Sequence, residues 1–194
     1  MEERLGLPPS DEEVVKMTLK EPNQYGILME RYEAKLKRYV TRLGVRNHED
    51  QLNVLQEIFI KAYRNLNGFD TDLSFSSWMY RIAHNEAISF YRKKNVRPEG
   101  HLVGDGEVVL EFLSSKEDGP EIKFDRLVNA EEVSRALERI DEKYREPIIL
   151  RFFEHKEYDE ISDILQIPMG SVGTLLHRGK KQLASVLNKD ILRI

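Results

Sequence analysis

Apolar side chains recur at three- and four-residue steps through most of the first 95 residues of this 194-residue chain. The segments 23–43 and 48–66 carry this spacing over nearly their whole length. Such spacing places the apolar side chains on one face of a helix, whereas a strand with one buried face alternates with a period of two. No part of these 95 residues alternates for long enough to indicate a sheet. We therefore expect an all-α fold.

Short polar motifs mark where these helices begin and end. Ser10-Asp-Glu-Glu13 has the pattern of a capping box, which predicts a helix that begins there and ends near Glu21-Pro22. Gly44 is placed to end the second helix, and Asn47 is placed to cap the third. Asn67-Gly68 predicts the turn that follows.

The stretch 75–94 predicts a helix with two unlike faces. At about 100° per residue, one side carries an apolar stripe made of Phe75, Met79, Ile82, Ala83 and Phe90. The other side carries rings, an amide and cations, namely Tyr80, Arg81, His84, Asn85, Ile88, Tyr91 and Arg92, followed by Lys93 and Lys94. Rings that stack on unpaired bases, beside cations that hold phosphates, are typical of a surface for single-stranded nucleic acid. An ordinary amphipathic helix with incidental surface aromatics is the alternative, and the helix alone does not decide between them.

Residues 96–128 differ in composition from both flanking segments. Eight acidic residues and two lysines fall between 99 and 125, among several glycines and prolines. This composition predicts an acidic, partly extended linker whose few apolar residues dock on another surface. A disordered spacer without a partner is the alternative.

Helical spacing returns at about residue 129 and indicates a second domain. Pro147 falls within it and is tolerable only near the first turn of a helix. The segment 158–165, the short turn Gln166-Ile-Pro168 and the segment 169–187 predict a helix-turn-helix, whose second helix normally enters the major groove of DNA. Its solvent side would carry Ser171, Thr174, Leu175, Arg178, Lys181 and Gln182, flanked by His177 and Lys180. A structural helical hairpin with a basic last turn is the alternative.

Composition excludes several classes of function. The chain has no cysteine, so disulfides, thiolate catalysis and cysteine zinc sites are excluded. Its five histidines are scattered, and no carboxylate pair or nucleophile constellation accompanies them, so we expect no enzyme activity, metal site, cofactor or small-molecule substrate. No basic leader or apolar run of membrane-spanning length is present, which predicts a cytoplasmic protein without membrane insertion. The net charge of −4 conceals a basic helix at 75–94 and an acidic linker.

Four stretches, taken in order, resemble the bacterial extracytoplasmic-function sigma factors. The stretch from Gln56 to Tyr63 resembles the family's region 2.2, and the stretch from Phe75 to Asn85 resembles regions 2.3 and 2.4. Residues 140–151 and 167–179 resemble regions 4.1 and 4.2. Each motif is moderately specific, and their joint order is the strong signal.

This resemblance implies two small helical domains joined by the acidic linker. Residues 1–95 would form the region 2 domain, which binds core RNA polymerase and reads and melts the −10 element. Residues 96–128 would be the linker, which threads between the domains and imitates nucleic acid through its acidity. Residues 129–194 would form the region 4 helix-turn-helix domain, which reads the −35 element.

The resemblance also implies a role for individual residues of the −10 site. Trp78 and Tyr80 match aromatics associated with strand opening, and Asn85 matches an amide that faces the captured non-template base. Phe69 would wall the pocket of a flipped base. Backbone phosphates would be held by Arg81, Arg92, Lys93 and Lys94. His84 would also belong to the −10 contact surface. For Trp78, packing in the core is an equal alternative.

Further contacts are implied outside the −10 site. Contacts to the −35 element would come from Ser171, Thr174, His177, Arg178, Lys180 and Lys181. Contacts to polymerase would come from Asn53, Gln56, Glu57 and Lys61. The implied partners are the clamp and flap of core RNA polymerase, promoter DNA in double- and single-stranded form, and an anti-sigma factor.

Three positions depart from the family pattern. Asn53 stands where an acidic residue is usual, and Gly173 and Leu175 stand where basic residues are common. Glycine within a helix costs roughly 1 kcal/mol relative to alanine, whereas Leu175 has the chemistry to meet a thymine methyl or a partner protein. Two other functions remain open: a helix-turn-helix regulator that binds duplex DNA without polymerase, and a sigma-like module that only binds proteins.

Overall fold

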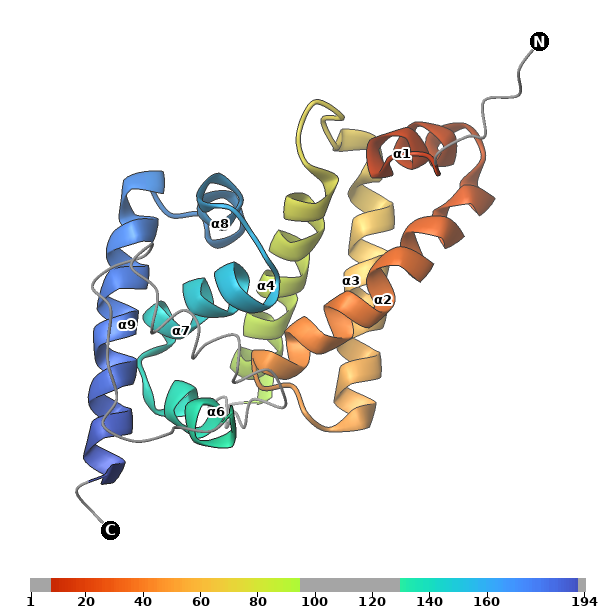
Figure 1. The fold of residues 1–194 in the computed structure, drawn as a ribbon. Helices are drawn as coiled ribbons and strands as arrows, with labels where there is room; N and C mark the ends of the chain where they lie inside the picture. Colours follow the sequence, from red (N-terminus) through yellow and green to blue (C-terminus); the bar gives the residue numbers. More distant parts are fainter. Residues whose placement is uncertain (1–7, 95–129, 192–194) are drawn as a thin grey trace.

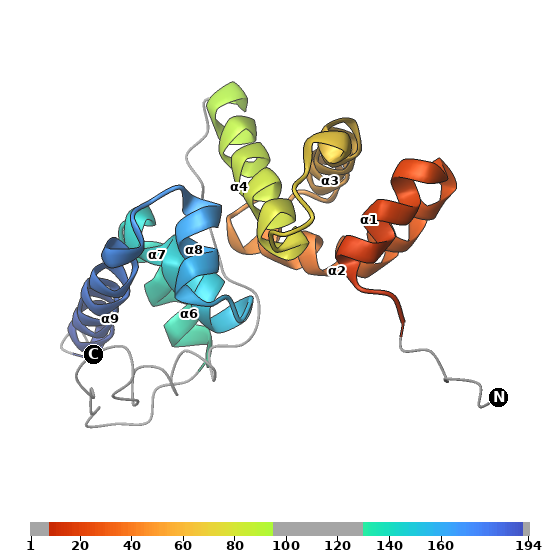
Figure 2. The same ribbon diagram turned by 90° about the horizontal axis from the view of Figure 1, so that it is seen from above.

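The structure is a computed structural model that describes residues 8–94 and 130–191. Within these ranges every regular element is helical, and the helices form two bundles (Figures 1 and 2). The expected all-α fold is confirmed for these residues. The predicted linker lies outside the described residues.

The first bundle contains four helices and two short 3₁₀ turns. They are α1 (Asp11–Lys20), η1 (Pro22–Gln24), α2 (Tyr25–Arg42), α3 (His48–Asn65), η2 (Leu66–Gly68) and α4 (Phe75–Lys94). Both predicted caps are present. Ser10 and Glu13 form the capping box, and the Asn47 side chain accepts hydrogen bonds from the backbone amides of Glu49 and Asp50. Gly44 follows α2 with φ of 113°, a conformation that favours glycine. The core of this bundle includes the fully buried Leu36, Ile58 and Met79.

Helix α1 braces the beginning of α4. Glu12 accepts a hydrogen bond from the Phe75 amide at 3.1 Å, across 63 residues of sequence. Asp11 accepts from Arg31 at 2.7 Å and also from the Tyr32 hydroxyl, which ties α1 to α2. The first amides of a helix have no partner within the helix, so an acidic acceptor there stabilises the position at which α4 starts.

The second bundle contains the predicted helix-turn-helix. Its elements are α6 (Ala130–Arg139), α7 (Glu142–Ile148), η3 (Ile149–Phe153), α8 (Tyr158–Leu165) and α9 (Met169–Ile191). Gln166 ends α8 in the left-handed conformation, and the Ser162 hydroxyl donates to the Ile167 carbonyl at 2.6 Å, which closes the turn.

The expectation that Pro147 would lie near the first turn of a helix is wrong. Pro147 is the sixth residue of α7, which continues directly into the π-helical segment η3. Proline cannot donate the backbone hydrogen bond of an α-helix. The chain accommodates it where the helix changes from α to the wider π form.

Gly179 allows α9 to approach α7 closely. A Cβ atom at this position would lie 2.9 Å from Ile148 Cδ1 and 3.3 Å from the Tyr144 backbone carbonyl. Both distances are below normal contact, and the carbonyl belongs to a packed helix. A side chain at this position therefore separates the two helices.

We expect Gly179→Ala to lower the free energy of unfolding by about 1–3 kcal/mol, because overpacking outweighs the gain in helix propensity. Gly26→Ala in α2 is the control, since nothing lies within 4 Å of the added Cβ there. That change should raise stability by up to about 1 kcal/mol. Urea unfolding of both variants measures the difference, and equal stabilisation by both would contradict the close approach.

Candidate nucleic-acid interface

Helix α4 presents an exposed polar surface that is narrower than the sequence predicts. The side chains of Asn85, Arg92 and Lys93 are exposed, and the side chain of Lys94 lies outside the described set. Opposite them, the expected stripe is buried at Phe75, Met79 and Ala83 and partly buried at Ile82 and Phe90. The amide and two cations therefore remain available on this helix.

The expectation that Tyr80 and Tyr91 face solvent is wrong in this arrangement. The Tyr80 ring lies 5.0 Å from the Tyr39 ring, and its hydroxyl donates to Glu154 of the second bundle at 2.6 Å. The Tyr91 hydroxyl donates to the Leu43 carbonyl at 3.1 Å. Helical periodicity gives the angle of these side chains on α4, but the partners that cover them come from distant segments.

Trp78 and Phe69 belong to an aromatic cluster at the beginning of α4. The Phe69 ring centroid lies 5.1 Å from that of Trp78 and 5.4 Å from that of Phe75. Phe69 is buried and Trp78 is partly buried. These contacts favour the packing alternative for Trp78, and a pocket for a flipped base at Phe69 stays a prediction.

The His84 imidazole is uncharged in this arrangement, so it is not suited to holding a phosphate. Its Nδ1 lies 3.4 Å from the Tyr39 hydroxyl. Burial lowers the pKa of His84 to about 4. The imidazole is therefore uncharged at pH 7 in this arrangement.

The second bundle covers one side of α4 through polar contacts. Glu154 accepts from Arg42 and from Tyr80, both at 2.6 Å. Arg81 forms an ion pair with Asp163 at 2.8 Å. Two of the predicted −10 residues, Tyr80 and Arg81, are thus occupied by the other domain.

The serines of α4 also take part in this interface. The Ser77 hydroxyl donates to Glu160 at 2.9 Å, and the Lys156 ammonium donates to Ser76 at 2.7 Å. Burial alone raises the pKa of Glu160, but hydrogen bonds, with Lys156 foremost, hold it below its usual value. Glu160 is therefore ionised at neutral pH, and the interface is held by charged hydrogen bonds.

The predicted −35 residues on α9 differ in solvent exposure. Thr174, Arg178 and Lys181 are exposed, and Ser171 and His177 are partly exposed. Lys180 is fully buried, so the expectation that it flanks the solvent side is wrong in this arrangement. It lies on the buried stripe of α9, four residues after Leu176 and three before Leu183, both of which are fully buried.

Gly173 and Leu175, which depart from the family pattern, are both partly buried on α9. A Cβ atom at Gly173 would lie 3.3 Å from the Tyr158 ring, so this position faces α8. Leu175 is half-buried. The two residues are therefore part of the contact surface of the helix-turn-helix as well as of its outer face.

Helix α3 places all four predicted polymerase contacts on the surface. Asn53, Gln56, Glu57 and Lys61 are exposed, and Lys61 forms an ion pair with Glu86 of α4. Their role in binding polymerase stays a prediction.

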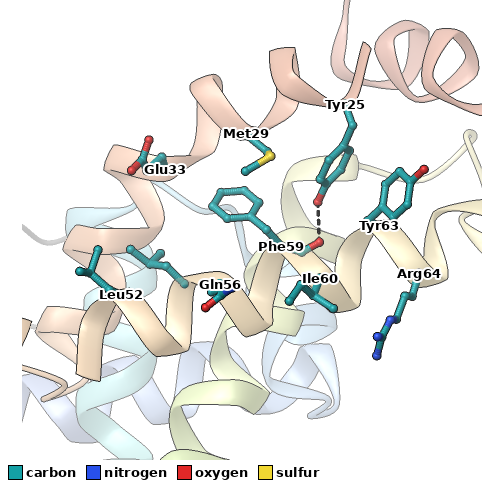
Figure 3. Close-up of a pocket in the computed structure, with 10 residues that line it drawn as sticks. Tyr25, Met29, Glu33, Leu52, Gln56, Phe59, Ile60, Tyr63 and Arg64 are labelled. Atoms are coloured by element: carbon teal, nitrogen blue, oxygen red, sulfur yellow. Dashed lines mark hydrogen bonds between the residues drawn. The ribbon is translucent and has the colours of Figure 1, made fainter. Parts of the chain in front are cut away.

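The sequence did not reveal an apolar groove beside these residues, between α2 and α3. Figure 3 shows its lining, in which the Tyr25 hydroxyl donates to the Phe59 carbonyl at 2.8 Å. The groove has a volume of about 440 Å³. Met29, Leu52 and Tyr63 line it and remain 41%, 49% and 45% exposed. Helical spacing assigned all three to an apolar face, but it did not show that this face stays uncovered.

Among residues 8–94 and 130–191, no helix is long and apolar enough to cross a membrane. Within the same ranges, no group of three or more histidine, aspartate or glutamate side chains is arranged to hold a metal ion.

We expect the stability of the folded chain to fall as the pH drops from about 6.5 toward about 4, in part because of His84. The unfolded state binds a proton near pH 6.5, and the folded state resists it until about pH 4. The His84→Gln variant should lose on the order of 2 kcal/mol of this dependence. Proton NMR titration measures the pKa directly, and a midpoint near 6.5 would contradict the partly buried, neutral imidazole.

Comparisons with known proteins agree with this geometry. Residues 28–97 match the family described as sigma-70 region 2, and residues 130–183 match sigma-70 region 4. The chain is 34% identical to the ECF RNA polymerase sigma factor SigW of Bacillus subtilis over 161 residues, which cover 80% of this chain and 84% of SigW. It is 31% identical to the ECF sigma-E factor of Escherichia coli K12 over 180 residues, which cover 87% and 89% of the two chains.

Two solved structures share the fold. CnrH in complex with the cytosolic domain of CnrY has a TM-score of 0.67 at 22% identity, with 93% of this chain and 98% of that one covered. RpoE in complex with the anti-sigma factor NepR from Bartonella quintana has a TM-score of 0.60 at 19% identity, with 84% and 96% covered. The chain belongs to the ECF family of RNA polymerase sigma factors, which are initiation factors without enzyme activity that direct promoter recognition.

Proposed function

We propose that the two domains divide promoter recognition between them. Residues 1–95 bind core polymerase and open the −10 region, and residues 129–194 hold the −35 element and the polymerase flap. Residues 96–128 thread between the two domains. The chain acts in the cytoplasm, where it meets polymerase and promoter DNA, first as duplex and then as an opened strand.

Asn85 gives the strongest support for −10 reading by α4. Its amide is exposed on the helix, with Arg92 and Lys93 exposed two turns further on. An amide offers both a donor and an acceptor to a base edge, and the two cations hold phosphates without sequence choice. Asn85 would therefore select a base, and the cations would hold its strand.

In this closed arrangement, DNA cannot reach all of the predicted −10 residues on α4. Tyr80 and Arg81 are bound to Glu154 and Asp163 of the second domain. DNA that contacts these two side chains requires α8 to move away from α4. We propose that this separation accompanies polymerase binding, and that the closed arrangement is the form held by an anti-sigma factor.

The exposed side of α3 and the groove beside it are the proposed contact with the polymerase clamp. Gln56 is both a predicted polymerase contact and part of the groove lining. Exposed apolar side chains in a groove, rimmed by polar ones, are typical of a protein interface. CnrH and RpoE are bound to CnrY and NepR in their structures, so an anti-sigma factor is the second proposed partner.

We expect Asn85→Ala to impair promoter opening while polymerase binding is unchanged. Loss of the base contact, worth about 1–3 kcal/mol, should lower open-complex formation about tenfold or more. Asn23→Ala, another exposed amide, is the control. Transcription in vitro with purified core polymerase, together with permanganate footprinting, measures opening; equal loss of opening and polymerase affinity would assign Asn85 a structural role.

We expect Leu52→Glu to weaken polymerase binding by about 1–3 kcal/mol, because a charge would enter an apolar contact. Leu19→Glu is the matched control, since Leu19 is 48% exposed on α1 and does not line the groove. Binding of labelled polymerase to both variants separates the two positions. Equal affinities for the two variants would remove the groove from the interface.

A further inference from the structure

A polar cavity lies where the two domains meet. It has a volume of about 270 Å³ and is lined from both domains. Lys35 and Arg38 come from α2, and Ser76 comes from α4. His155 and Lys156 come from the turn between η3 and α8. Apart from Tyr80, none of the predicted −10 or −35 residues lines this cavity.

The cavity holds an excess of positive charge. Lys35 and Arg38 are three residues apart on α2, so they lie on the same face, and both are exposed. No ion pair of either residue is found within 8–94 and 130–191; Lys35 only lies over the Tyr32 ring, at 5.2 Å. A contact with a ring leaves the charge of the ammonium in place.

The carboxylates near the cavity are already engaged by other donors. Glu154 accepts from Arg42 and from Tyr80. Glu160 accepts from Lys156 at 2.8 Å. The two pairs of opposite charge, Arg42 with Glu154 and Lys156 with Glu160, therefore cancel, and the charges of Lys35 and Arg38 remain.

The remaining donors suit a phosphate group. Guanidinium and ammonium groups both bind phosphate oxygens, the first with two parallel hydrogen bonds. The Ser76 hydroxyl accepts from Lys156 and is also hydrogen-bonded to the Tyr32 hydroxyl, so Lys35 and Arg38 are the donors that remain. The Tyr80 hydroxyl gives its hydrogen to Glu154 and supplies no donor.

We propose that this cavity binds the phosphate group of a small phosphorylated compound. Because both domains line the cavity, the site is complete only while they are packed together. A ligand that binds one arrangement stabilises it by mass action. Such a compound would therefore hold the chain closed; only this consequence for promoter opening rests on the proposed function.

Pyrophosphate is the probe for this site, used at constant ionic strength with the full chain and without polymerase. Isothermal titration should show saturable binding of one pyrophosphate, and the melting temperature should rise with its concentration. The double variant Lys35→Gln/Arg38→Gln should lose at least about tenfold in affinity. Lys16→Gln/Lys20→Gln, which changes two exposed lysines of α1, should bind as the unchanged chain does.

A third variant tests whether both domains are needed. Glu154→Ala removes a negative charge from the cavity, so a site within one domain would bind pyrophosphate more tightly. A site that needs the closed arrangement would bind it more weakly, because Glu154 holds the domains together. Circular dichroism confirms that each variant is folded.

Three results would overturn the proposal. They are absence of saturable binding at millimolar pyrophosphate, equal affinity of the Lys35/Arg38 double variant, and tighter binding by Glu154→Ala. The phosphate of a DNA strand is the other source of the same chemistry. If a short oligothymidylate binds through Lys35 and Arg38 while pyrophosphate does not, these residues contact the DNA backbone and the cavity is not a ligand site.

Discussion

The placement of the two domains depends on one buried carboxylate. The Glu154 side chain is 4% exposed and is satisfied by two donors of the first domain, Arg42 and Tyr80. Removal of one member of a buried pair costs roughly 3–5 kcal/mol, although the intact pair adds little net stability, because desolvation offsets the attraction. Such an interface can select one relative orientation of the two domains, although it adds little net free energy to their association. It therefore suits the separation of the two domains that we propose.

The same contacts connect packing to DNA binding. Tyr80 and Arg81 are withdrawn from solvent by the second domain, whereas Asn85, Arg92 and Lys93 stay exposed further along α4. The proposed function would therefore leave part of the basic surface of the closed chain open to a first encounter with DNA, which long-range attraction favours. Under the proposed function, the Tyr80 ring and the Arg81 guanidinium become available to an opened strand only after the domains separate.

Much of the fold follows from the sequence, because helix formation is signalled locally. The capping box at Ser10, the cap at Asn47 and the turn after Leu165 all lie where the pattern predicts them. Helical spacing does not indicate which other segment packs against each face of a helix. Tyr80 is buried by Glu154 from 74 residues away, and Met29 and Leu52 stay exposed because no segment of the described chain covers their groove. Both outcomes depend on contacts between distant residues, which no local spacing records.

We propose that α8 covers part of the predicted −10 surface of α4 in the free chain and leaves it in the initiation complex. The chain has no cysteine, so Asn65→Cys and Ser185→Cys, at two exposed positions, would carry the only spin labels. Double electron–electron resonance then measures the distance between the domains. We expect one narrow distance distribution in the free chain and a longer distance with polymerase and promoter DNA. An unchanged distance in the complex would contradict this proposal.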